Sequence, residues 1–126
     1  MTGKQQDLML DAYLPPDSDS RAERPAVVFM HGGGFKAGNK RGGRKLALML
    51  AARGYAVFSV NYRLTGGYHE AETQGQVFDA QEDFRAAIRF VRSKAEDYRL
   101  DTDKIVASGY SAGAITALQM TYAEPF

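Results

Sequence analysis

The sequence of 126 residues contains no cysteine and no tryptophan, and its charges almost cancel. Without cysteine, disulfides, thiolate nucleophiles and cysteine-ligated zinc are all excluded. The 16 lysines and arginines against 15 aspartates and glutamates leave a formal net charge of +1. Such a balance creates no overall field to attract nucleic acid or an anionic membrane surface. We therefore expect no nucleic-acid partner.

Long hydrophobic segments are also missing. The longest apolar run, Leu46–Ala52, is far shorter than the roughly 20 residues that a helix needs to cross a bilayer. The first residues, Met1–Asp7, are polar and do not resemble a targeting signal. We expect no membrane span and a cytoplasmic location.

The composition that remains is that of one folded domain. Hydrophobic residues make up 44% of the chain, and there are 13 glycines. A chain of this size buries only about two-thirds of the surface that its unfolded form exposes, so its hydrophobic core is just large enough to stabilise one domain. We expect a single domain over residues 1–126.

Strand-like and helix-like segments alternate along the chain. Apolar runs and one period-two stretch predict strands at 8–14, 26–30, 55–60 and 105–108. Helices are predicted at 46–53, from Asp79 onward and at 112–123, and the residues between them at Thr65–Gly75 and Asp101–Lys104 are expected to form a loop and a turn. This order predicts an α/β fold, with a mostly parallel sheet of about four strands and helices on both faces.

The helix from Asp79 has the clearest pattern. Its apolar residues recur at spacings of four, three, four and three, at Phe84, Ile88, Val91, Ala95 and Tyr98. This spacing places them on one stripe of a helix, which we expect to face the core.

A serine motif lies between the last predicted strand and the last predicted helix. Residues Gly109–Gly113 have the pattern G-x-S-x-G. A sharp strand-to-helix turn leaves no room for side chains beside the serine, and it exposes the hydroxyl of Ser111 at the carboxyl edge of the sheet. The amide of Ala112, at the helix N-terminus, would point to where an oxyanion forms. The alternative is a turn of small residues that packs a helix closely on a strand.

A second glycine motif follows another predicted strand. His31 is followed by Gly32, Gly33 and Gly34, which allow the backbone to bend until its amides face a substrate. Loops of this kind supply the other oxyanion donors in α/β-hydrolases. Two such motifs, each at the end of a strand, are much more specific than either alone.

Together these segments resemble the α/β-hydrolase carboxylesterases of the hormone-sensitive-lipase type. The resemblance covers nearly the whole chain, in the segments 10–15, 31–35, 60–64, 82–92 and 103–113. It implies a truncated α/β-hydrolase fold that acts on a small ester, with no cofactor and no metal. It also implies that Ser111 is the nucleophile and that the amides of Gly33, Gly34 and Ala112 form the oxyanion hole. The residues that support the site structurally would be His31, Gly32, Gly109 and Gly113.

The catalytic triad of that family is not complete here. Its order is serine, acid, histidine, but no histidine or aspartate follows Ser111. Glu124 would lie roughly 15 Å or more along the last helix. The chain resembles the amino-terminal half of an esterase, so activity of this chain alone is an open question. The base could be His69, or it could come from a second polypeptide or another protomer.

Other ligand sites are less well supported. Residues 32–37 match a dinucleotide fingerprint, but no acid follows roughly 20 residues later, and the P-loop pattern after Gly33 is incomplete. Five basic residues between Lys36 and Lys45 could attract an anion, but a solvated helix start explains them better, because no aromatic platform accompanies them. The acids at 96–103 lack the spacing of a calcium loop.

The predicted strand at 105–108 leads to a second hypothesis. In the family the sheet continues past this strand, so here its outer edge would lack a neighbour. Unpaired apolar edges recruit partners. We expect a homo-oligomer or a complementing chain to cover it. Two function classes therefore remain open, a serine ester hydrolase and a non-catalytic module that associates through its exposed sheet edge.

Overall fold

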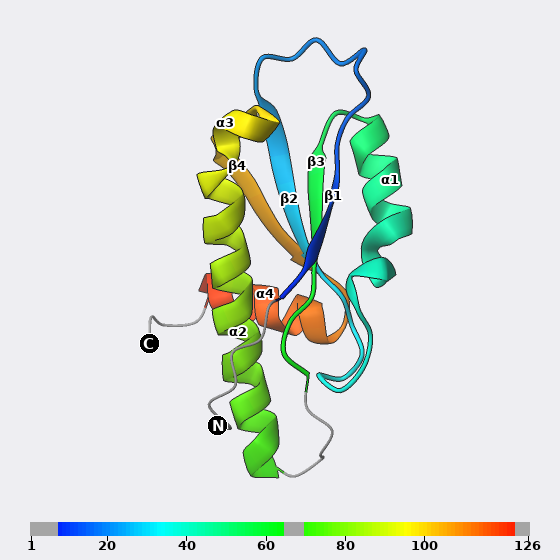
Figure 1. Ribbon diagram of the computed structural model, residues 1–126. Helices are drawn as coiled ribbons and strands as arrows, with labels where there is room; N and C mark the ends of the chain where they lie inside the picture. Colours follow the sequence, from blue (N-terminus) through cyan, green and yellow to red (C-terminus); the bar gives the residue numbers. More distant parts are fainter. Residues whose placement is uncertain (1–7, 65–69, 123–126) are drawn as a thin grey trace.

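The computed structural model describes residues 8–64 and 70–122, and of 70–77 it describes the backbone only (Figure 1). Strands and helices alternate for most of the chain, in the order β1 (Leu10–Tyr13), β2 (Arg24–Met30), η1 (Lys40–Gly43), α1 (Arg44–Ala52), β3 (Ala56–Val60), α2 (Glu70–Ser93), α3 (Ala95–Tyr98), β4 (Leu100–Gly109) and α4 (Ala112–Tyr122). Within these residues no helix combines the length and hydropathy of a membrane span.

The four strands form one sheet in the order β1-β3-β2-β4. Strand β2 lies between β3 and β4 and is parallel to both, whereas β1 pairs antiparallel with β3. The predicted mostly parallel sheet is therefore confirmed, with one antiparallel strand at its edge. In this arrangement the carboxyl ends of β2 and β4 lie side by side, since Met30 pairs with Gly109.

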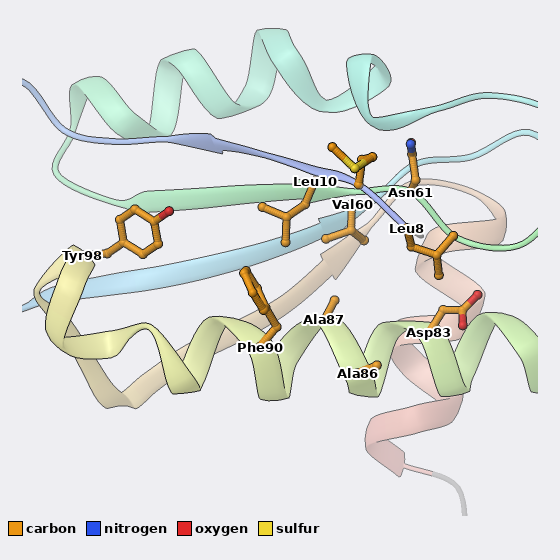
Figure 2. A pocket seen from close by; sticks show the side chains of 10 residues that line it. Leu8, Leu10, Val60, Asn61, Asp83, Ala86, Ala87, Phe90 and Tyr98 are labelled. Carbon is orange, nitrogen blue, oxygen red and sulfur yellow. The ribbon is translucent and has the colours of Figure 1, made fainter. Parts of the chain in front are cut away.

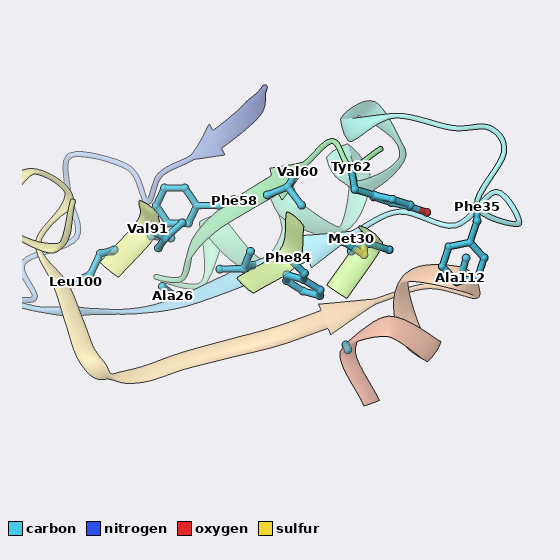
Figure 3. Packing of buried hydrophobic residues seen from close by; sticks show 14 residues of the cluster. Ala26, Met30, Phe35, Phe58, Val60, Tyr62, Phe84, Val91, Leu100 and Ala112 are labelled. Atoms are coloured by element: carbon cyan, nitrogen blue, oxygen red, sulfur yellow. The ribbon is translucent and has the colours of Figure 1, made fainter. Parts of the chain in front are cut away.

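Helices cover both faces of the sheet (Figure 1). Helix α1 lies on one face, and α2 and α4 lie on the other. The side chains of β2 alternate between two clusters, so that Val28 and Met30 face α2 while Val27 faces α1. Figure 3 shows the larger cluster, in which Phe58 and Phe84 are fully buried. A strand covered on both faces has an almost continuous apolar sequence, which explains the run from 26 to 30.

Helix α2 begins earlier than its apolar stripe predicts. Its backbone is helical from Glu70, so the loop predicted over Thr65–Gly75 is wrong for residues 70–75. The single glycine at 75 costs only about 1 kcal/mol in a helix interior, and a helix of this length tolerates it. The stripe is confirmed as far as Val91, because Phe84 and Val91 are buried and Ile88 packs against them. Its last two members, Ala95 and Tyr98, pack against the same cluster but lie in the separate helix α3.

The segment between α2 and β4 also differs from the expectation. The helix ends at Ser93, and α3 is a separate single turn that ends at Tyr98 and is capped by Arg99, whose φ of +54° reverses the chain. The turn predicted at Asp101–Lys104 is wrong, because β4 already starts at Leu100. These four polar residues lie where the register with β2 shifts, between the pairs Arg24–Leu100 and Ala26–Ile105.

In the first half of the chain the predicted elements differ less from those of the structure. Strand β1 covers only Leu10–Tyr13 of the predicted 8–14, and both Leu10 and Tyr13 pack against buried clusters. The 3₁₀ turn η1 precedes α1 and was not predicted from the sequence. After α1, Gly54 has a φ of +100°, the left-handed conformation expected of a glycine that ends a helix.

Candidate functional site

Ser111 lies on the sharp turn between β4 and α4. Its side chain is exposed, and its φ of +53° is in the left-handed region, where a residue with a side chain is uncommon. Such a conformation costs of order 1–3 kcal/mol and persists only where surrounding contacts impose it. The serine motif therefore forms a strained turn with the hydroxyl on the outside.

The two glycines of that motif allow three pieces of backbone to meet. A Cβ on Gly113 would overlap the carbonyl oxygen of Met30, and a Cβ on Gly109 would overlap the carbonyl group of Gly113. The amide of Tyr110 donates to the Met30 carbonyl at 3.2 Å, so the turn is also tied to β2. Only glycine allows α4 to begin this close to the end of β2.

The triple-glycine loop lies against this turn. A Cβ on Gly32 would stand 2.9 Å from the carbonyl oxygen of Tyr110 and 3.1 Å from the Cβ of Ser111. Gly33 and Gly34 have φ values of +135° and +65°, so the backbone bends in a way that side chains rarely permit. The structure brings the two glycine motifs together although they are about 80 residues apart in the sequence.

The loop is anchored at its far end. The Gly33 carbonyl accepts from the amides of Lys36 and Ala37 at 3.2 and 3.1 Å, which closes a tight turn. Phe35 is buried in the same cluster as Ala112, the first residue of α4 (Figure 3). The triple-glycine loop and the start of α4 are therefore packed into the same hydrophobic cluster.

His31 supports the loop from inside. It is 3% exposed, its ring stacks on Tyr62 with centroids 4.4 Å apart, and its Nδ1 lies 2.7 Å from the Gly32 carbonyl oxygen. Because a carbonyl can only accept, Nδ1 carries the proton of the neutral ring. Burial lowers the pKa of His31 below its ordinary value, so this neutral form is favoured.

Tyr62 is a part of the site that sequence reasoning missed. Its hydroxyl donates to the His31 carbonyl oxygen at 2.8 Å, and burial raises its pKa to about 12. It therefore stays a neutral donor at ordinary pH. The segment 60–64 that contains it is one of those that carry the family resemblance, but no role was predicted for Tyr62.

A charged cluster fixes the end of β3 to α2. The carboxylate of Asp83 accepts from the Arg63 amide at 2.8 Å and from its Nε at 3.0 Å. Asp79 and Glu82 complete the set, with ion pairs of 3.4 and 3.0 Å. The bond to Asp83 is the largest cause that raises the pKa of Arg63 above its ordinary value. The residues of this cluster hold the backbone that carries Tyr62.

An open groove of about 640 Å³ adjoins the site on the α1 face of the sheet. It is lined by Gly32, Gly109 and Tyr110 and extends to Leu46 and Met49 of α1. A separate cavity of about 380 Å³ lies between β1 and α2 (Figure 2) and contains none of the predicted site residues.

Among the described residues, no histidine base or acidic partner of a catalytic triad lies hydrogen-bonded to Ser111. His31 directs Nδ1 at Gly32, and its Nε2 is buried with no partner there. His69, the candidate base, lies outside the described residues, as does Glu124.

No group of three or more potential metal ligands is found in residues 8–64 and 70–122. Of the five basic residues between Lys36 and Lys45 that could attract an anion, Lys40 already forms an ion pair with Asp11, with 2.7 Å between Nζ and Oδ1.

Comparison with known proteins identifies the family. The family model described as BD-FAE matches residues 10–125. The chain belongs to the BD-FAE family. Its members are α/β-hydrolases like hormone-sensitive lipase, so the resemblance drawn from the motifs is confirmed.

Several relatives with curated names are esterases. A probable isoprenylcysteine alpha-carbonyl methylesterase of Arabidopsis thaliana is 36% identical over 105 residues, which are 83% of this chain and 23% of that protein. Gut esterase 1 of Caenorhabditis elegans is 35% identical over 106 residues, 80% of this chain and 19% of that protein. The chain thus spans about a fifth of the length of these relatives.

Solved structures agree with this assignment. Thermogutta terrifontis esterase 2, phosphoramylated by tabun, matches with a TM-score of 0.75 and 34% identity, over 90% of this chain and 41% of that chain. Its apo form matches with a TM-score of 0.73 and 35% identity, also over 90% and 41%. The predicted α/β-hydrolase fold is confirmed by these neighbours, of which the given sequence matches a part.

Proposed function

We propose that this chain carries the nucleophile and the oxyanion hole of a serine carboxylic ester hydrolase. Ser111 is the nucleophile, and the amides of Gly33, Gly34 and Ala112 bind the negative charge. The observation that carries the proposal is the approach of the triple-glycine loop to the strained serine turn, with 3.1 Å between a Cβ built at Gly32 and the Cβ of Ser111. Backbone donors held rigidly near a reacting oxygen are the usual source of oxyanion stabilisation.

The reaction follows from the chemistry of these groups. The Ser111 oxygen attacks the carbonyl carbon of the ester, and its proton passes to a base. The carbonyl oxygen becomes an oxyanion, which the loop amides and the N-terminus of α4 stabilise. Collapse breaks the bond to the alkoxy oxygen, and the alcohol leaves with the proton. Water then cleaves the acyl-serine, releases the carboxylic acid and restores the hydroxyl.

The base is the part that the described residues do not supply. A serine hydroxyl is a weak nucleophile until a neighbouring group accepts its proton. His31 is committed to Gly32 through Nδ1, so it supports the loop and does not act as the base. The proton acceptor then comes from His69 or from a second polypeptide. We expect the chain alone to turn over ester slowly.

The relatives support an ester of a small acid as the substrate. Thermogutta terrifontis esterase 2 has been solved with propionate and with butyrate bound, at 35% identity to this chain. The same protein has been solved phosphonylated by sarin. A fluorophosphonate is therefore a suitable probe of Ser111, and short-chain p-nitrophenyl esters are suitable substrates.

The test is covalent labelling of the purified chain with a fluorophosphonate. We expect one label at Ser111, located by mass spectrometry of tryptic peptides, and none in Ser111→Ala. Ser108→Ala is the matched control, since Ser108 lies on β4 just before the turn and should leave labelling unchanged. Equal labelling of wild type and Ser111→Ala would contradict the proposal. Ester turnover is compared in the same three proteins.

The alternative is a non-catalytic module of the same fold. One observation favours it, namely that Ser111 has no hydrogen-bonded base among the residues the structure describes. A chain that neither labels nor hydrolyses p-nitrophenyl esters, yet is folded by circular dichroism, would support this alternative.

A further inference from the structure

Two amides of the triple-glycine loop are held in direction by bonds to the carbonyl groups of the same peptide units. In a planar trans peptide, the carbonyl of one residue and the N–H of the next point in opposite directions. The Gly32 carbonyl oxygen lies 2.7 Å from Nδ1 of His31, and the Gly33 carbonyl accepts from two later amides of the loop at 3.2 and 3.1 Å. The first bond therefore sets the direction of the Gly33 amide, and the second pair sets that of Gly34.

The direction of the Gly33 amide depends on a side chain. Three consecutive glycines have no side chain that limits backbone rotation, so the peptide planes of this loop can adopt other orientations. The bond from His31 selects one of them, and it forms only while the imidazole ring keeps Nδ1 towards the Gly32 carbonyl. Whatever fixes this ring also fixes the Gly33 amide.

Tyr62 holds His31 at two points. Its ring stacks on the imidazole with centroids 4.4 Å apart and an interplanar angle of 25°, and its hydroxyl donates to the His31 carbonyl oxygen at 2.8 Å. Both residues are buried, and Figure 3 shows the Tyr62 ring pointing from the end of β3 towards the loop that carries Phe35. The stack fixes the plane of the imidazole, and the hydroxyl fixes the peptide unit between His31 and Gly32.

The same carbonyl lies against the start of α4. A Cβ built on Gly113 would stand 2.9 Å from the His31 carbonyl oxygen, so this oxygen lies between the Tyr62 hydroxyl and the turn that carries Ser111. The contact of Tyr62 therefore holds the loop at the point where it meets the serine turn.

We propose that Tyr62 is a positioning residue for the oxyanion hole, and that it orients the Gly33 amide through His31. This inference rests on the proposed function, in which the Gly33 amide binds the negative charge of the transition state. Tyr62 itself contacts no reacting atom and transfers no proton. Its effect on the reaction comes only from the direction that it imposes on the loop.

The experiment compares two substitutions of Tyr62 with a matched control. Tyr62→Phe keeps the stacked ring and removes the hydroxyl, whereas Tyr62→Leu removes both. Tyr98→Phe is the control, since Tyr98 packs against the same hydrophobic cluster but lies in α3, where it lines the separate cavity of Figure 2. Fluorophosphonate labelling of Ser111 over a series of probe concentrations gives a limiting rate and a half-saturating concentration. Circular dichroism and urea unfolding define conditions in which all four proteins are folded.

We expect the limiting rate to fall about tenfold in Tyr62→Phe and about 100-fold in Tyr62→Leu, because small displacements of reacting groups slow a reaction strongly. The half-saturating concentration should stay the same, since the amide meets a charge that develops only in the transition state. Tyr98→Phe should label like the wild type. A purely structural role would leave the limiting rate of the folded protein unchanged, so equal limiting rates for Tyr62→Phe and Tyr98→Phe would overturn the proposal.

The amide signal of Gly33 provides a second test that needs no reactivity. In nuclear magnetic resonance spectra of protein labelled with ¹⁵N-glycine, this signal should move in Tyr62→Phe and stay in place in Tyr98→Phe. If the wild type does not label at Ser111, the proposed function fails, and the Gly33 signal then decides the role of Tyr62 alone. A signal that moves only in the Tyr62 variant would support the positioning of this amide, and one that stays in place would overturn it.

Discussion

Gly32 is the residue at which the triple-glycine loop comes nearest to Ser111. Its φ is not in the left-handed region, so the reason for a glycine here is space and not backbone conformation. Gly34 shows the opposite case, because nothing lies within 4 Å of a Cβ built there while its φ is +65°. The two glycines of one motif therefore serve different physical needs.

This difference predicts the effect of Gly32→Ala. The new methyl group would meet Tyr110 and Ser111 at 2.9–3.1 Å and would push the loop away from the serine. If the loop amides stabilise the reaction, fluorophosphonate labelling of Ser111 should slow by about 10–100-fold. Gly42→Ala is the control, since its Cβ would lie 3.3 Å from His31 Cβ, and it should label at nearly the wild-type rate. Unchanged labelling of Gly32→Ala would argue against the proposed oxyanion hole.

The buried ring of His31 predicts a pH dependence of stability. Burial lowers its pKa, so the unfolded chain, with a pKa near 6.5, takes up a proton before the folded chain does. Stability from this group is therefore complete above about pH 6.5 and is lost as the pH falls towards the lower folded pKa. Urea unfolding from about pH 7.5 to about pH 5 should show a smaller loss for His31→Asn than for wild type. Equal losses would contradict this assignment.

At the level of single elements, the contact between α2 and the segment after β3 depends on one buried carboxylate, that of Asp83. The side chain of Asp83 is 9% exposed and accepts both from the Arg63 backbone and from its guanidinium, whereas that of Glu82 is 71% exposed. Both acids contact the same arginine, so the pair separates the effect of burial from that of charge. The residue Tyr62, which supports His31, immediately precedes Arg63.

Removing Asp83 should therefore destabilise the fold more than removing Glu82. Asp83→Ala leaves the partly buried Arg63 amide and Nε without their acceptor, although Asp79 and Glu82 still pair with the guanidinium, and this loss costs about 1–3 kcal/mol of unfolding free energy. Glu82→Ala removes an exposed ion pair and should cost less than about 1 kcal/mol. Urea denaturation of both variants measures the difference. Equal destabilisation would mean that Asp83 is held no more tightly than a surface charge.

Pattern alone predicted the central elements well and their limits less well. The strand at 26–30 and the stripe of α2 were predictable because apolar periodicity reports burial directly. The start of α2 was not, because its first turns lie beyond the stripe and include Gly75. Likewise, the polar residues at 101–104 look like a turn, and only the bulge between the β2 and β4 registers explains why they lie in a strand.

For the molecule as a whole, sheet order decides which surfaces remain open. The site lies at the carboxyl ends of β2 and β4, and β4 is also the edge strand. The catalytic proposal therefore depends on the pairing of β2 with β4, which places the two glycine motifs side by side. Solved esterases match this chain over 41% of their own length, so most of their structure lies outside the region compared.

The sequence by itself determined the fold class and predicted most residues of the candidate site. Glycine spacing around Ser111 and after His31 reflects local steric needs, and apolar periods reflect which faces are buried, so both can be read from short segments. Only the tertiary structure decided how close the two glycine motifs come, that Tyr62 stacks on His31, and that Asp83 receives Arg63. These contacts join residues far apart in the chain, and their geometry depends on strand register and helix placement, which no single segment encodes.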